Sequence, residues 1–193
     1  MPIYHEHKCI FTHIPKCAGC SIHKILCECL ETPYEKAYSD HLKLTMTNET
    51  ENYFKFTFVR NPWDRFLSTY FYFRAQGRGG RGDAKMGKVV NRYKSFKDFA
   101  LNFNNIPSNK WVFPHFNEQL NWISKNHDFV GRFETLQEDF KTICDRTGIP
   151  RHQLPHENKS NHKHYTESYD EETKQIIAEK YAKDIEYFGY KFE

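Results

Sequence analysis

A short polar loop near the N-terminus has the residue types of an anion-binding site. Residues 15–21 (PKCAGCS) follow an apolar run and precede a helical pattern. Amide groups at a helix N-terminus and the positive end of the helix dipole attract anions. Ala18 and Gly19 let the backbone approach a ligand closely, Lys16 adds a positive charge and Ser21 adds a hydroxyl. This pattern predicts a phosphate-binding loop; the alternative is an ordinary strand-to-helix turn capped by Ser21.

A second segment with anion-binding chemistry follows another apolar run. Arg60 ends the run FKFTFVR, and Asn61-Pro62 marks a helix start, because proline is favoured in the first turn. Arginine offers phosphate oxygens a planar pair of N–H groups. Ser68, eight residues on, reaches the same anion only if the chain folds over it. Asp64 and Arg65 are expected to form a solvated structural pair.

Strand-then-helix units must position these two segments. Residues 8–14 form a short β-rich run, and Ile22, Ile25, Leu26 and Leu30 then recur at helical spacing. The pattern further predicts strands at 53–60 and 129–133 and helices at 63–73, 95–103, 115–124, 134–147 and 169–187. Strands that alternate with helices predict an α/β protein, a P-loop-like three-layer fold with a central parallel sheet flanked by helices.

Length and composition fit one domain over residues 1–193. Seventeen Phe, twelve Tyr and three Trp can supply a core where aliphatic residues are few. A net charge of +3 argues against a nucleic-acid partner or a polybasic membrane protein. No apolar run approaches the roughly 18 residues of a membrane span, and no signal-peptide pattern begins the chain. We therefore expect a soluble cytoplasmic protein whose six cysteines are free thiols.

The positive charge is concentrated in one segment. Residues 74–94 contain seven basic residues and one acidic residue, a net charge of +6, so the remaining residues sum to −3. The Gly/Arg-rich part, about residues 76–88, has no periodicity and is expected to be a flexible loop. Its charge would attract an acidic or sugar acceptor. A solvated linker is the alternative.

Taken together, the two anion-binding segments resemble the two signatures of the sulfotransferase superfamily, in its carbohydrate sulfotransferase branch. That family has a loop of the type H-I-P-K-T-A-G-T-S and a later V-R-N-P-Y/W-D-R-x-x-S-x-Y. This chain has HIPKCAGCS at 13–21 and VRNPWDRFLSTY at 59–70. VGRFE at 130–134, LPHENKS at 154–160 and KDIEYFGY at 183–190 extend the resemblance over nearly the whole chain.

The resemblance implies a donor, 3′-phosphoadenosine 5′-phosphosulfate, and a hydroxyl acceptor on a carbohydrate, with no metal ion. Carried over by position, the 5′ phosphosulfate would be held by Pro15, Lys16, Ala18, Gly19, Cys20 and Ser21. Arg60 and Ser68 would hold the 3′ phosphate, with Arg132 and Lys159 as further candidates.

Two catalytic roles follow from the same resemblance. Lys16 is the candidate for stabilising charge on the leaving phosphate. His41, between the two motifs, is the candidate general base that takes the proton of the acceptor hydroxyl. His115 is the reserve candidate for contact with the acceptor.

Cysteine replaces the family's threonine at positions 17 and 20. A thiolate at Cys20 would repel the phosphosulfate. Oxidation or alkylation of Cys20 is expected to block donor binding. The alternative is that cysteine is tolerated at position 20 as a small residue, because only the backbone of the loop has a role there. A zinc site on Cys17, Cys20, Cys27 and Cys29 is disfavoured, because two would lie in the loop and two on opposite sides of a helix.

Two other functions stay open at this point. One is a P-loop kinase of small molecules, although its Gly-Lys-Ser/Thr order is missing here. The other is a non-catalytic module that binds a nucleotide or a polyanion.

Overall fold

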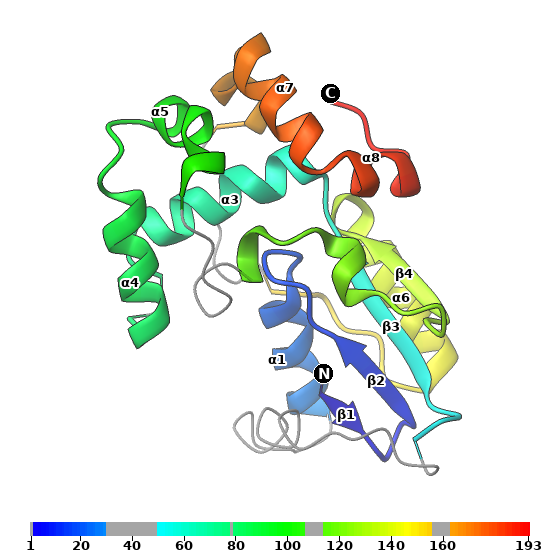
Figure 1. Ribbon diagram of the computed structural model, residues 1–193. Helices are drawn as coiled ribbons and strands as arrows, with labels where there is room; N and C mark the ends of the chain where they lie inside the picture. The colour runs from blue at the N-terminus through cyan, green and yellow to red at the C-terminus, as the bar shows by residue number, and fades with distance from the viewer. Residues whose placement is uncertain (1, 30–49, 78, 107–113, 156–162) are drawn as a thin grey trace. The chain divides into compact units, whose positions relative to one another are not determined.

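A computed structural model describes residues 2–29, 50–77, 79–106, 114–155 and 163–193 (Figure 1). The chain divides into two compact units. The first consists of Met1–Arg60 and Asn121–Asn158, and the second of Asn61–Leu120 and Lys159–Glu193. The expectation of one domain over the whole chain stays a prediction.

A four-stranded sheet forms the centre of the first unit, in the order β1 (Ile3–Tyr4), β2 (Cys9–Thr12), β3 (Phe54–Val59) and β4 (Phe129–Arg132). β2, β3 and β4 are parallel, with Phe11 opposite Phe56 and Val59 opposite Arg132. β1 runs antiparallel to β2 and was not predicted. All four residues of β2 are buried, as is typical of parallel strands covered by helices.

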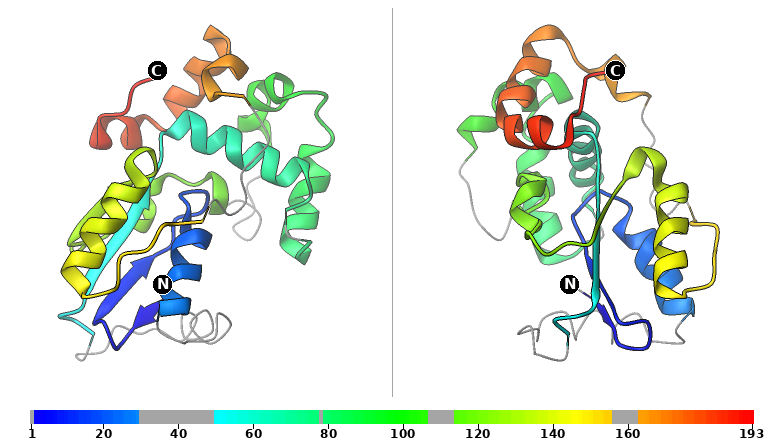
Figure 2. Two further views of the ribbon diagram at one scale, coloured as in Figure 1. Left: turned by 180° about the vertical axis from the view of Figure 1, so that it is seen from behind. Right: turned by 90° about the vertical axis from the view of Figure 1, so that its right-hand side faces the viewer.

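Two helices cover one face of this sheet (Figure 2). Helix α1 (Gly19–Cys29) buries Ile22 and Leu26, and α6 (Leu136–Thr147) buries Phe140 and packs against β3 and β4. A 3₁₀ turn, η4 (Phe133–Thr135), leads into α6, which ends as predicted at Gly148 in the left-handed conformation. The predicted α/β class, with a mostly parallel sheet and helices, is confirmed.

Helices around an aromatic core make up the second unit: α3 (Pro62–Arg74), α4 (Arg81–Val90), α5 (Phe96–Leu101), α7 (Glu171–Lys180) and α8 (Ala182–Phe188). Asn61 caps α3 by accepting the N–H of Trp63 at 3.2 Å. The ring of Phe66 lies 5.1–6.0 Å, centroid to centroid, from those of Phe96, Phe99, Phe103 and Phe116. The core is aromatic, as the composition predicted.

Short 3₁₀ turns are η1 (Phe103–Asn105), η2 (Pro114–Phe116), η3 (Gln119–Trp122) and η5 (Tyr165–Ser168), of which η2 and η3 stand where one helix was predicted. The predicted helix at 115–124 is wrong. The buried Asp184 carboxylate accepts the N–H groups of Gln119 and Leu120, at 2.8 and 3.0 Å, which a continuous helix would use internally. The predicted helix at 169–187 breaks at Tyr181, whose hydroxyl donates to the carbonyl of Phe116 at 2.8 Å.

Helix α4 corrects the expectation of a flexible loop at about 76–88, because the chain is helical from Arg81 onward. Met86 and Val90, one helical turn apart, are fully buried in the aromatic core. Gly87 allows a close crossing with α3, since a Cβ there would lie 3.1 Å from the carbonyl oxygen of Phe73. Tertiary packing therefore overrides the weak helix propensity of a glycine-rich segment.

Candidate active site

The predicted anion-binding loop joins β2 to α1 in a sharply bent conformation. Lys16 and Ala18 have φ values of 71° and 60°, in the left-handed region that is costly for residues with a Cβ. The N–H of Cys17 donates to the carbonyl of Ile14 at 3.4 Å, and that of Ile22 donates to the carbonyl of Ala18 at 3.2 Å. Left-handed residues before a helix can turn successive amide groups toward one point. The backbone thus has the form that an anion-binding loop requires.

Gly19, the first residue of α1, packs against the imidazole of His13. A Cβ at position 19 would lie 2.1 Å from the Cδ2 atom and 2.2 Å from the Nε2 atom of His13. The imidazole stacks almost parallel to the ring of Phe11, with centroids 5.8 Å apart. The His13 imidazole therefore fills the space that a side chain at position 19 would need. Gly19 thus has a packing role in addition to the predicted one of letting the backbone approach a ligand.

Arg60 connects the two predicted motifs. One guanidinium nitrogen donates to the carbonyl oxygen of Lys16 at 3.1 Å, and the guanidinium carbon lies 3.9 Å from the centre of the Phe133 ring. The side chain is buried, with 8% of the residue exposed. Arg60 follows β3 and the loop follows β2, so neighbouring parallel strands bring both to one edge of the sheet. The structure thus places the first arginine of the second motif against the first motif.

The loop side chains differ in accessibility. Lys16 and Cys20 are half-buried, whereas Ser21 is buried. The thiol of Cys17 points inward and donates to the carbonyl of Pro15 at 3.8 Å. Of the two cysteines that depart from the family pattern, Cys20 is therefore the one open to a ligand or reagent.

The remaining cysteines of the first helix and strands are poor nucleophiles. Burial raises the pKa of the Cys9 thiol to about 12 and, with Glu28, that of Cys27 to about 11. The Cys27 sulfur lies 3.7 Å from the Nε2 atom of His23, which in turn contacts the Tyr4 hydroxyl. Within the described ranges, no three His, Cys, Asp or Glu side chains are grouped as metal ligands.

His127 is a residue near the loop that the sequence did not single out. It precedes β4, and its Nε2 atom lies 2.8 Å from the hydroxyl of Thr12, the last residue of β2. Its Nδ1 atom accepts the backbone N–H of Ser124 at 3.1 Å. Burial lowers the pKa of His127, which favours the neutral imidazole. No motif in the sequence marks this contact, because 115 positions separate the two residues.

The other predicted site residues lie elsewhere or outside the described chain. Ser68 is a buried residue of α3 in the second unit, and its role toward the nucleotide stays a prediction. His115, in η2, stacks on Tyr72 with centroids 5.6 Å apart. Arg132 pairs in register with Val59 next to Arg60. His41 and Lys159 lie outside the described residues.

Arg65 differs from its predicted solvated state. Among the described residues it is one of the largest fully buried side chains, and its guanidinium donates to the carbonyls of Asn117 and His115 at 2.8 and 3.0 Å. This arginine of the second motif therefore fixes the segment that carries His115.

Several curated proteins resemble this chain. Carbohydrate sulfotransferase 14 of Danio rerio is 25% identical, with 96% of this chain and 60% of the relative covered. Carbohydrate sulfotransferase 9 of Homo sapiens is 26% identical, with 93% and 47% covered. An uncharacterized protein of Archaeoglobus fulgidus is 28% identical over 52% of this chain and 72% of its own length. The chain thus spans about half to three-fifths of the two sulfotransferases.

No solved structure shows a significant match. In the part of the chain that the structure describes, no helix is long and apolar enough to cross a membrane. The model of the Sulfotransferase family matches residues 2–191 and so includes both predicted anion-binding motifs. With this match over nearly its full length and the two motifs joined at one sheet edge, the chain belongs to the sulfotransferase family.

Proposed function

We propose that the protein transfers a sulfuryl group from 3′-phosphoadenosine 5′-phosphosulfate to a hydroxyl group of a carbohydrate. The observation that carries this proposal is the hydrogen bond from Arg60 to the carbonyl of Lys16, which joins two anion-binding motifs. A donor with anionic groups at the 5′ and 3′ positions of one ribose needs two such motifs. The names of the two carbohydrate sulfotransferase relatives support the acceptor class.

The chain offers distinct groups to the two ends of the donor. The loop amides at the start of α1, together with Lys16, would hold the 5′ phosphosulfate. Arg60, whose guanidinium has five N–H groups, would hold the 3′ phosphate with Ser68. The contact between Arg60 and Phe133 fixes the guanidinium plane, which supports recognition of a phosphate by a paired donor.

In the proposed reaction, the bond between sulfur and the 5′ phosphate oxygen breaks as a bond forms between sulfur and the acceptor oxygen. The acceptor proton passes to a general base, for which we propose His41, and His115 is the reserve candidate for contact with the acceptor. Adenosine 3′,5′-bisphosphate leaves, and Lys16 stabilises the charge that develops on its 5′ phosphate. The cationic side chain and the helix N-terminus supply this stabilisation without a metal ion in the proposed scheme.

Calorimetry with adenosine 3′,5′-bisphosphate and adenosine 5′-monophosphate tests the donor site. The wild-type protein is expected to prefer the bisphosphate. Arg60→Ala should remove most of this preference, about 10- to 100-fold, because hydrogen bonds to charged groups are worth about 1.5–3 kcal/mol. Lys125→Ala, which removes an exposed lysine of the same unit, is the matched control. An unchanged preference in Arg60→Ala would overturn this placement of the 3′ phosphate.

Turnover with labelled donor and a panel of carbohydrates tests the reaction. Lys16→Ala is expected to reduce product formation at least about 100-fold, as for a lost electrostatic stabiliser. His41→Ala should lower turnover while nucleotide affinity survives. Magnesium-dependent ATP binding would instead favour a kinase. Tight bisphosphate binding without product from any acceptor would favour a non-catalytic binding module.

A further inference from the structure

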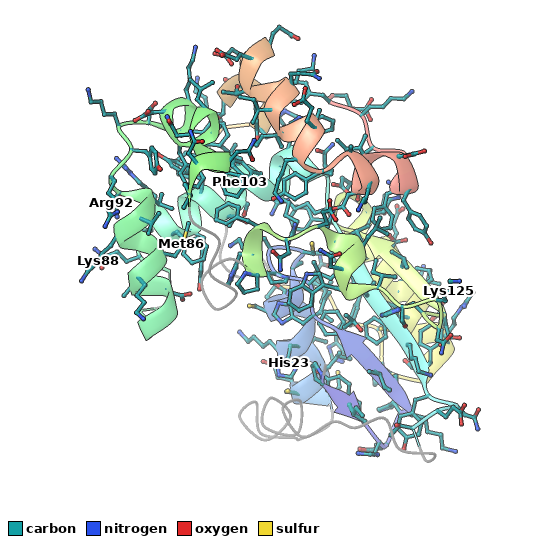
Figure 3. The ribbon with its side chains drawn as sticks, viewed as in Figure 1. His23, Met86, Lys88, Arg92, Phe103 and Lys125 are labelled. Carbon is teal, nitrogen blue, oxygen red and sulfur yellow. The ribbon has the colours of Figure 1, made fainter. Side chains whose placement is uncertain are left out.

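Helix α4 presents a row of cations to solvent. Lys85 and Lys88 in the helix and Arg92 in the turn that follows are all exposed. Their spacing of three and four residues places them within about 60° of one another around the helix axis. Met86 and Val90 are fully buried on another side. Figure 3 shows Lys88 and Arg92 pointing away from α3 while Met86 points toward it.

Three contacts fix which side of α4 faces outward. Met86 and Val90 are anchored in the aromatic core. Gly87 lies against the end of α3, with room for no larger residue unless the backbone near Phe73 moves. The Tyr72 hydroxyl donates to the carboxylate of Asp83, in the first turn of α4, at 2.6 Å. Lys85 and Lys88 therefore lie on an ordered helix, and Arg92 lies in the turn that ends it, rather than on a flexible loop.

The row is not neutralised by nearby acids. Among the described residues, the side chains of Lys85, Lys88 and Arg92 have no hydrogen-bond or ion-pair partner. Lys97, on the neighbouring α5, is by contrast paired with Asp170 at 2.6 Å. Like charges at this spacing destabilise a helix, so an anionic ligand on this face would relieve a repulsion that is built into the fold.

We infer that the α4 basic face, defined as Lys85, Lys88 and Arg92, binds an anionic carbohydrate chain that carries carboxylate or sulfate groups. The identification of the chain as a carbohydrate, and as the acceptor, rests on the proposed function. The row extends about 10 Å along the helix, which suits a polymer whose charges repeat along its length. A neutral glycan would gain nothing from it.

The observations favour a carbohydrate over a nucleic acid. Single-stranded nucleic acids are bound by cations interleaved with exposed aromatic side chains on which bases stack. The exposed described residues of α4 and the turn after it are Gly82, Lys85, Lys88, Asn91 and Arg92, none of them aromatic.

Binding to immobilised chondroitin sulfate, with dextran as the neutral polymer and single-stranded DNA as the competing polyanion, tests the inference. The wild-type protein is expected to bind chondroitin sulfate, with an affinity that falls as salt rises, and not dextran. The triple variant Lys85→Glu/Lys88→Glu/Arg92→Glu should bind at least tenfold more weakly. If circular dichroism shows that the reversed charges unfold α4, the variant with glutamine at the same three positions is tested instead (Lys85→Gln/Lys88→Gln/Arg92→Gln). It should show an intermediate loss of affinity for chondroitin sulfate.

The matched control changes the net charge equally at other places. Lys125, Lys141 and Lys183 are exposed on other elements, and their triple change to Glu should alter chondroitin sulfate affinity less than twofold. Three results would overturn the inference. They are an equal loss of chondroitin sulfate affinity in both triple variants, unchanged affinity in the α4 variant, and tighter binding of the wild-type protein to DNA than to chondroitin sulfate at the same salt. α4-dependent binding by a chain that transfers no sulfuryl group would support it and overturn the proposed function instead.

Discussion

The packing of Gly19 against His13 predicts that Gly19→Ala disturbs the loop that we propose binds the donor. The new Cβ would lie 2.1 Å from the Cδ2 atom of His13, about 1.3 Å inside the 3.4 Å at which ordinary contacts begin. The imidazole stacks on the ring of Phe11, which hinders its movement toward β2. Either His13 leaves its place or the N-terminus of α1 shifts away from the loop.

Two opposing effects determine how much stability Gly19→Ala loses. Alanine is favoured over glycine within helices by about 1 kcal/mol, so without His13 the change would stabilise the protein. Overpacking of this kind costs about 1–3 kcal/mol. We expect a net destabilisation of about 1 kcal/mol. Because hydrogen bonds to an anion weaken steeply with misalignment, affinity for adenosine 3′,5′-bisphosphate should fall about tenfold.

Urea unfolding and calorimetry with the bisphosphate measure both effects. His13→Ala/Gly19→Ala should recover stability and affinity relative to Gly19→Ala, with a coupling energy of about 0.5–3 kcal/mol between the sites. Gly82→Ala, at a helical position with nothing within 4 Å of the new Cβ, is the control and should be neutral or stabilising. Wild-type behaviour of Gly19→Ala, or no recovery in the double variant, would refute the reasoning.

Three further predictions address the buried arginine, the loop cysteine and the histidine near the loop. Arg65→Met should lower the free energy of unfolding in urea by about 2–4 kcal/mol, because it leaves two carbonyls without their charged donor; a loss below about 1 kcal/mol would contradict the role given to Arg65. Iodoacetamide should modify the half-exposed Cys20 before Cys9 and Cys27, because these two thiols are buried and have pKa values of about 12 and 11. Saturating bisphosphate should slow the modification of Cys20. Mass spectrometry measures the order, and full nucleotide binding by protein alkylated at Cys20 would count against the site. Burial lowers the pKa of His127 below 6.5, so the unfolded chain takes up a proton more readily and stability should fall as pH drops below about 6.5. The urea midpoint should fall less between pH 7.5 and pH 5 in His127→Gln than in the wild-type protein. An equal fall in both would show that His127 does not cause the loss of stability.

Elements with strong local patterns were predictable. The buried runs at β2 and β3, the helix start at Asn61-Pro62 and the end of α6 at Gly148 all depend on residues close together in the chain. Features that depend on distant partners were missed. Asp184 breaks the predicted helix at 115–124 from 65 positions away, and the core of the second unit imposes a helix on the glycine-rich segment that contains Met86 and Val90.

For the candidate site, the sequence by itself determined the residue types and their order, because each motif is contiguous and its chemistry is carried by its own side chains. Only the tertiary structure decided how these groups meet. The bond from Arg60 to Lys16 spans 44 positions and exists because β2 and β3 are neighbours in the sheet. The fit of His13 to Gly19, the burial of Arg65 and the outward row of cations on α4 likewise depend on packing. Contacts of this kind leave no periodic or local signal, since their free energy comes from surfaces that the folded chain brings together.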